Sequence, residues 1–124
     1  MNLRSLIARL EEVHDHGLIV PRGIGAPMSY RGSYECCAFE PVSNVTVAEM
    51  LGHARSAIDE TFEGYKGGEY TFDGWTECYI APYGSTGEEL GYVLLEMILE
   101  EAERLDGTEA DIPWGEGHWP WGER

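Results

Sequence analysis

The clearest structural signal in the chain is the stretch TVAEMLGHARSAIDETF, residues 46–62. Thr46 precedes an apolar run and is followed three residues later by Glu49, which is the pattern of a capping box at a helix N-terminus. Apolar side chains then recur every three or four residues, so they share one helical face: Val47, Met50, Leu51, Ala54, Ile58 and Phe62. We predict an amphipathic helix that Gly64 ends.

The segment before this helix contains another predicted helix and two predicted strands. The same helical spacing predicts a first helix that stops at Gly17, with its apolar face formed by Leu3, Leu6, Ile7, Leu10 and Val13. The short apolar run 18–20 is predicted as a strand that Pro21 terminates. A glycine- and proline-rich loop is expected next, followed by a strand over 29–39 that Pro41 closes.

A second long amphipathic helix is predicted from Thr86, which repeats the capping-box spacing with Glu89, to Leu105. Its apolar face is formed by Leu90, Val93, Leu94, Met97, Ile98 and Leu105, and Leu95 and Leu99 make this stripe wider than one core contact requires. A wide stripe indicates burial against a second surface, such as another subunit. The tail 106–124 lacks periodicity, but its three tryptophans predict that it packs on the domain or reaches across a subunit interface.

Residues 65–72 and 75–81 are predicted as two antiparallel strands, because Asp73-Gly74 between them suits the positive φ angles of a tight hairpin turn. Together these elements predict the α+β class: a small antiparallel sheet packed against two to three amphipathic helices, with an irregular Trp-rich C-terminal tail. The 124 residues fit one core, so we expect a single domain over 1–124.

The net charge of −15 is unevenly distributed along the chain. Residues 1–60 carry five arginines against eight acids, whereas residues 61–124 carry three basic residues against fifteen acids. Because binding to nucleic acid depends on clustered Lys and Arg, we expect no direct nucleic-acid partner. Two interpretations of the acids remain: they keep the protein soluble, or they present a phosphate-like surface to a nucleic-acid-binding protein.

Three cysteines, Cys36, Cys37 and Cys78, are an odd number without Cys-x-x-Cys spacing, so we expect reduced, buried thiols and no metal site. No apolar run approaches the roughly 18 residues that cross a bilayer, so we expect a cytoplasmic protein without a membrane partner. The sequence contains no Gly-x-Ser-x-Gly elbow and no His-Glu-x-x-His motif. We therefore expect a binding protein without a cofactor, not an enzyme.

The most informative loop is formed by Ser29, Tyr30, Arg31 and Gly32. It places a guanidinium between an aromatic ring and a glycine, an arrangement that suits a phosphate attached to a base or ribose. The alternative is that Arg31 pairs with one of the many surface acids. A second candidate for phosphate binding is Lys66, the only lysine, although a turn explains the glycines beside it without a ligand.

Four short motifs follow one another along the chain: Ser29-Tyr30-Arg31-Gly32, Ala38-Phe39-Glu40-Pro41, Asn44-Val45-Thr46-Val47 with Glu49-Met50-Leu51, and Thr61-Phe62-Glu63-Gly64-Tyr65-Lys66-Gly67-Gly68. This set, in order over residues 3–100, resembles a group of small bacteriophage-encoded proteins. The length, the N-terminal helix and the arginine loop are similar to the first type of Thoeris anti-defence proteins, which act as sponges. The resemblance implies a homo-oligomer built from dimers that sequesters a cyclic nucleotide or cyclic ADP-ribose-type immune signal without cleaving it.

The resemblance also implies further site residues. Those sponges hold the ligand at a subunit interface with an N-terminal arginine, an aromatic ring and a C-terminal arginine of the partner subunit, and Arg31 matches the first position. The ring is one of Tyr70, Phe72 and Tyr83, and the late arginines are Arg104 and Arg124. The expected ligand-binding residues are Ser29, Tyr30, Arg31, Gly32, Lys66, Tyr70, Phe72, Tyr83 and Arg104.

The leading hypothesis is therefore a protein that captures a small anionic nucleotide-derived ligand in the host-cell cytoplasm. The alternative is an acidic, nucleic-acid-mimicking inhibitor of a restriction or CRISPR-type complex, which the negative second half of the chain supports. A small hydrolase acting on a nucleotide is a third hypothesis.

Overall fold

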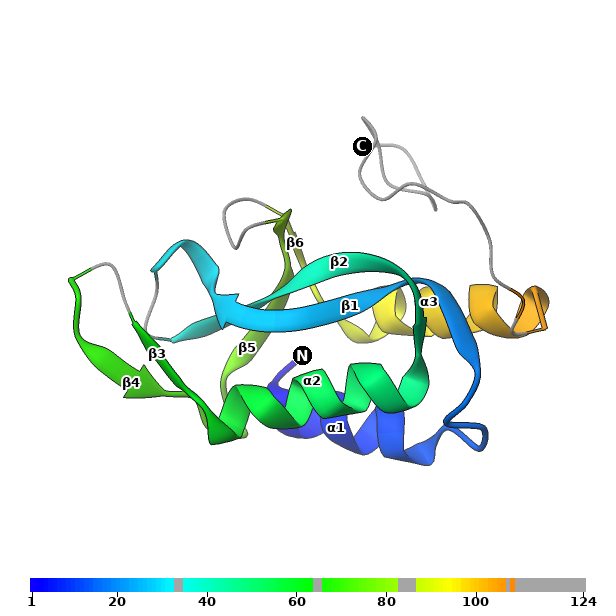
Figure 1. Cartoon of the computed structure of the whole chain (residues 1–124), viewed down its shortest axis with the longest axis horizontal. Helices are drawn as coiled ribbons and strands as arrows, with labels where there is room; N and C mark the ends of the chain where they lie inside the picture. Colours follow the sequence, from blue (N-terminus) through cyan, green and yellow to red (C-terminus); the bar gives the residue numbers. More distant parts are fainter. Residues whose placement is uncertain (33–34, 64–65, 83–86, 107, 109–124) are drawn as a thin grey trace.

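The computed structural model describes residues 1–32, 35–63, 66–82, 87–106 and 108. The helices of this part of the chain are α1 (Leu3–Glu12), α2 (Val47–Asp59) and α3 (Tyr92–Arg104). The main sheet has the order β1-β2-β5-β6, and its strands are β1 (Ile19–Ser29), β2 (Cys36–Thr46), β5 (Glu77–Ile80) and β6 (Glu88–Glu89). A separate two-stranded sheet contains β3 (Thr61–Glu63) and β4 (Glu69–Thr71). Helices α1 and α2 lie along one side of β1 and β2 (Figure 1), and the predicted α+β class is confirmed.

The main sheet is mixed, whereas the sequence predicted a purely antiparallel sheet. Strands β1 and β2 are antiparallel, but β5 runs parallel to β2, with Cys37 opposite Cys78. The predicted hairpin at Asp73-Gly74 is wrong, because β4 pairs with β3 instead of β5. Asp73 still makes a local turn, since its carboxylate accepts from the Trp75 N–H at 2.9 Å. The turn redirects the chain into the main sheet and does not join two paired strands.

Two prolines predicted to end strands lie inside them. β1 continues through Pro21 to Ser29, so the loop predicted there is a strand. Proline is tolerated in β1 because this is an edge strand, on which only one side needs a ladder of N–H groups. Pro41 lies opposite Ile24 of β1, beyond the part of β2 that also pairs with β5. At that position β2 again has a single paired neighbour, and it continues to Thr46.

Helix α2 begins as the sequence predicted. The Thr46 hydroxyl accepts from the Glu49 N–H at 3.1 Å, and the Glu49 carboxylate accepts from the Thr46 N–H at 2.9 Å. The bond from the Thr46 N–H, followed by a second bond that the Thr46 hydroxyl donates to the same carboxylate at 3.0 Å, holds the pKa of Glu49 below its usual value. The helix ends earlier than predicted, at Asp59, because the next residues form β3 and pair with β4.

Helix α3 begins at Tyr92, later than predicted, because Glu88 and Glu89 form strand β6 opposite Ile80 and Tyr79. Thr86 lies outside the described residues. The buried apolar side chains of α3 are Leu95, Ile98, Leu99 and Ala102, so Leu95 and Leu99, which were predicted only to widen the stripe, lie in the core. Val93 is 72% exposed.

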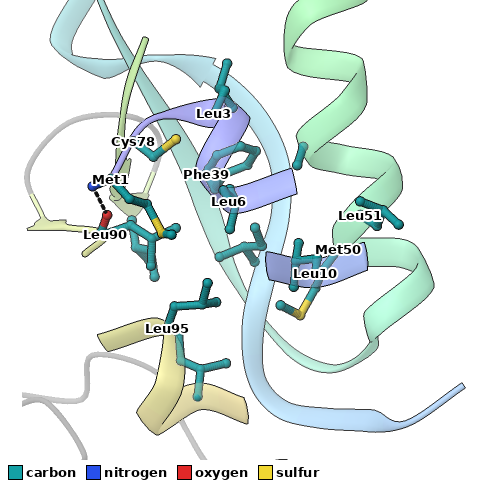
Figure 2. Packing of buried hydrophobic residues seen from close by; sticks show 14 of the residues in the cluster. Met1, Leu3, Leu6, Leu10, Phe39, Met50, Leu51, Cys78, Leu90 and Leu95 are labelled. Atoms are coloured by element: carbon teal, nitrogen blue, oxygen red, sulfur yellow. Dashed lines mark hydrogen bonds between the residues drawn. The ribbon is translucent and has the colours of Figure 1, made fainter. Parts of the chain in front are cut away.

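The core is a cluster of buried side chains from all three helices and the main sheet. Figure 2 shows Leu6 and Leu10 of α1, Phe39 of β2, Met50 of α2 and Leu95 of α3 converging in it. All five are 0% exposed, and burying each such side chain contributes about 1.5–3 kcal/mol. The same figure shows the amino group of Met1, which donates to the Leu90 carbonyl at 2.7 Å. The Trp-rich tail was predicted over 106–124, and its three tryptophans lie outside the described residues.

Candidate functional site

The connection between β1 and β2 carries four of the predicted binding residues. Ser29 ends β1 opposite Cys37, and Tyr30, Arg31 and Gly32 form a single 3-10 turn, η1. Arg31 has φ 55° and ψ 29°, and Gly32 has φ 79°. A non-glycine residue in this left-handed region costs roughly 1–2 kcal/mol. The fold therefore holds the arginine in a conformation that glycine would adopt more easily.

A residue that the sequence did not single out, Tyr79 of β5, completes the aromatic part of this site. The rings of Tyr30 and Tyr79 are stacked, with centroids 4.0 Å apart and an interplanar angle of 0°. Burial is the largest cause that raises the pKa of Tyr79, followed by its neighbours Cys36 and Glu89. Both rings are half-buried, so they form a fixed apolar surface beside the Arg31 turn that is still partly open to solvent. The signal that points to Tyr79 is strand register, which places it beside Ala38 of β2.

Arg31 differs from the other arginines in the described part of the chain, each of which has a partner. The partners are Glu96 for Arg9, Glu101 for Arg22 and Arg104, Glu11 for Arg55 and the ring of Trp75 for Arg4. Arg31 is exposed, and no ion pair or hydrogen bond of its side chain occurs among the described residues. The expected alternative, in which Arg31 pairs with a nearby acid, is therefore not seen within that part of the chain.

The other predicted site residues do not form one constellation with this turn. Tyr70 and Phe72 pack against Phe62, with centroids 6.4 and 4.8 Å from that of Phe62. Phe72 is only 3% exposed, so it is a core residue. Lys66 is exposed in the connection between β3 and β4, and Tyr83 lies outside the described residues.

Arg104 is remote from the turn within one chain. Its guanidinium lies 3.7 Å from the Glu101 carboxylate at the C-terminal end of α3. Figure 1 shows this end of α3 (orange) at the right of the view, whereas β1 leads into the turn toward the left. A contribution of Arg104 to a site at Arg31 therefore requires a second subunit.

The hollow that the structure shows is also separate from Arg31. A pocket of about 440 Å³ lies between the C-terminal ends of α1 and α3 and the loop that leads into β1. The Arg31 site is accordingly an exposed turn beside two stacked rings.

The cysteines offer neither a disulfide nor a ready nucleophile at the buried positions. All three thiols are free, and Cys37 and Cys78 are fully buried. Burial raises the pKa of Cys37 to about 12 and raises that of Cys78 as well. No group of three or more His, Cys, Asp or Glu side chains in the described ranges is arranged to hold a metal ion.

Within the described residues, no helix has both the length and the apolar character needed to cross a membrane. Comparisons with protein-family models, with curated protein sequences and with solved structures found no match to this chain.

Proposed function

We propose that the protein binds a small anionic ligand with an aromatic or ribose ring, of the nucleotide class, at the turn formed by Tyr30 and Arg31. The observation that carries this proposal is the open charge of Arg31. In a chain with net charge −15, every other described arginine has a partner, whereas the exposed Arg31 beside the tyrosine stack has none among the described residues. A guanidinium that is not neutralised by a neighbouring acid remains available to a phosphate.

The chemistry of the turn favours this ligand class. A guanidinium presents a planar fork of N–H donors that matches two phosphate oxygens. The Tyr30–Tyr79 stack offers an aromatic face on which a base can pack, and base–aromatic stacking contributes about 1–3 kcal/mol per base. The two features suit the two halves of a nucleotide.

We propose capture instead of turnover. A guanidinium is a hydrogen-bond donor without an acceptor, and burial raises the pKa of Tyr79, so its phenol is neutral near pH 7. Groups of this kind bind and orient a ligand but do not attack it. The fuller proposal follows the resemblance to the sponge proteins: a homo-oligomer in the host cytoplasm that sequesters a cyclic nucleotide or cyclic ADP-ribose-type signal.

Isothermal titration calorimetry with cyclic dinucleotides and cyclic ADP-ribose isomers tests the proposal. Arg31→Ala should weaken binding of the best ligand by about tenfold or more, because a charge-assisted hydrogen-bond pair is lost. Arg55→Ala is the matched control, since it removes the same charge at an exposed site where the guanidinium already pairs with Glu11. Equal losses in the two variants, or no heat with any of these ligands, would contradict the proposal. Ligand released by heating the complex should be chemically unaltered.

One observation favours the acidic-inhibitor alternative. Glu63 and Glu69 lie directly opposite each other on β3 and β4, and both are exposed. Like charges directly opposite each other destabilise a strand pair. A cationic partner that neutralises Glu63 and Glu69 would remove this cost. Binding to such a partner should weaken steeply with added salt and should be impaired by Glu63→Gln with Glu69→Gln, whereas Arg31→Ala should leave it unchanged.

A further inference from the structure

One row of side chains crosses the face of the main sheet that points away from the core. Residues directly opposite each other on neighbouring strands project on the same face. The row consists of Met28 of β1, Ala38 of β2, Tyr79 of β5 and Glu89 of β6. The next row projects on the other face, since Phe39 and Ile80 are opposite each other and are 0% exposed in the core. Glu89 therefore projects on the same face as Tyr79, whose ring stacks on that of Tyr30.

Glu89 is a close neighbour of Tyr79. The two residues are direct partners in the antiparallel pair of β5 and β6. The Cβ atoms of such partners lie about 4.5–5.5 Å apart, so the Glu89 side chain begins beside that of Tyr79. The negative charge of Glu89 contributes, after burial and Cys36, to the raised pKa of Tyr79. Its carboxylate therefore belongs to the immediate surroundings of the stacked rings.

The backbone that carries Glu89 is fixed by the residue that follows it. Leu90 is 0% exposed, and its N–H donates to the Cys78 carbonyl at 2.9 Å. The Leu90 carbonyl accepts from the Met1 amino group at 2.7 Å. A ligand that pairs with Glu89 therefore does not have to order this part of the backbone, which lowers the entropy lost on binding.

The Glu89 carboxylate is available to a ligand. Glu89 is exposed, and no ion pair or hydrogen bond of its side chain occurs among the described residues. Glu11, Glu96 and Glu101, by contrast, each pair with an arginine. The site at the tyrosine stack thus has a positive group next to Tyr30 in the chain and a negative group opposite Tyr79 on β6.

A carboxylate beside a base-stacking surface favours guanine over adenine. It accepts hydrogen bonds and donates none. The Watson–Crick edge of guanine presents two neighbouring donors, N1–H and the N2 amino group, which match the two oxygens of one carboxylate. The same edge of adenine presents the N6 amino group next to N1, whose lone pair repels a carboxylate oxygen. A site that pairs with both donors of guanine therefore discriminates against a base that lacks one of them.

We infer that Glu89 makes the site selective for guanine nucleotides, an inference that rests on the proposed binding of a nucleotide at the turn of Tyr30 and Arg31. Arg31 binds the phosphate, and the base packs on the tyrosine stack. The Glu89 carboxylate accepts from N1–H and from the N2 amino group of the guanine. Glu89 is then a specificity-determining residue, and the ligand class narrows to guanine-containing cyclic nucleotides.

Calorimetric titration with cyclic di-GMP and cyclic di-AMP tests this inference, because the two ligands have the same charge and the same backbone and differ only in the base. The parent protein should bind cyclic di-GMP at least about tenfold more tightly, since charge-assisted hydrogen bonds to the base are made with guanine alone. In Glu89→Gln the two Kd values should agree within about twofold, because an amide offers one acceptor and one donor group instead of two acceptors.

Glu88→Gln is the matched control. It removes the same charge from the neighbouring residue of β6, which lies opposite Ile80 and so belongs to the other face of the sheet. Its ratio of Kd values should equal that of the parent protein. A ratio that is unchanged in Glu89→Gln, or that falls equally in Glu88→Gln, would overturn the inference.

The same titrations separate failure of the inference from failure of the proposed function. Equal affinity of the parent protein for both dinucleotides, or binding of cyclic ADP-ribose alone, would overturn guanine selectivity and leave the proposed nucleotide site standing. Absence of binding for both dinucleotides and for the cyclic ADP-ribose isomers would refute the proposed function, and the inference with it.

Discussion

Replacing Arg31 with glycine should stabilise the fold while it removes the positive charge of the η1 turn. Arg31 has φ 55°, and a left-handed conformation costs a non-glycine residue roughly 1–2 kcal/mol. Glycine removes this cost but gains conformational entropy in the unfolded chain, which offsets about 0.4–1 kcal/mol. Among the described residues the exposed Arg31 side chain has no ion pair to lose. The expected net gain is about 0.5–1 kcal/mol in the free energy of unfolding.

Urea denaturation followed by circular dichroism measures this change, with Arg31→Ala as the companion variant. Alanine keeps the strained φ, so its free energy of unfolding should stay within about 0.5 kcal/mol of the parent value. Both variants lack the guanidinium, so both should lose the nucleotide-type ligand to the same extent. If Arg31→Gly lowers the free energy of unfolding, the guanidinium makes a stabilising contact, and the interpretation of Arg31 as an open charge is wrong.

Three further measurements test the packing and one ion pair of the fold. Gly23→Ala should lower the free energy of unfolding by about 1–3 kcal/mol in urea denaturation, because its Cβ would overlap a Val45 methyl; an unchanged value would contradict the close packing. Alkylation of the native protein followed by mass spectrometry should label half-buried Cys36 before the two buried thiols, and simultaneous labelling of all three would refute their burial. The hydrogen bonds with Arg9 lower the pKa of Glu96 from its usual 4.5. The ion pair therefore stabilises the folded protein above pH 4.5, and this stabilisation is lost as the pH falls through the lowered pKa of Glu96. Thermal unfolding of Glu96→Gln should therefore depend less on pH in that acidic range than unfolding of the parent does; parallel pH profiles would count against the pair.

Local signals in the sequence predicted α2 well, because the capping box depends only on Thr46 and Glu49, which are close in the chain. The strands were harder to predict, since pairing is decided by partners remote in sequence. A proline such as Pro21 ends a strand only where that strand is paired on both sides. The position of β1 at the sheet edge depends on the whole fold and cannot be seen in the local sequence. The Asp73-Gly74 turn is likewise real, but it does not specify which strand follows it into the sheet.

The candidate sites also combine features that local sequence predicts with features that depend on the whole fold. Arg31 stands out in the sequence because it lies between an aromatic residue and a glycine, and the structure places it in an exposed turn. Tyr79 could not be selected, because its stacking on Tyr30 follows from the parallel pairing of β5 with β2. The pocket beside α3 also depends on packing, since it brings Asp15 and Glu103 together from distant parts of the chain.

The most direct test of the account follows the rings of Tyr30 and Tyr79 by NMR while cyclic ADP-ribose or a cyclic dinucleotide is added. The account predicts that the resonances of both rings shift with saturation, and that Arg31→Ala needs about tenfold more ligand or more for the same shifts while the spectrum of the folded protein is otherwise intact. Ligand binding that leaves both rings unshifted, or shifts that saturate at the same ligand concentration in Arg31→Ala, would contradict it.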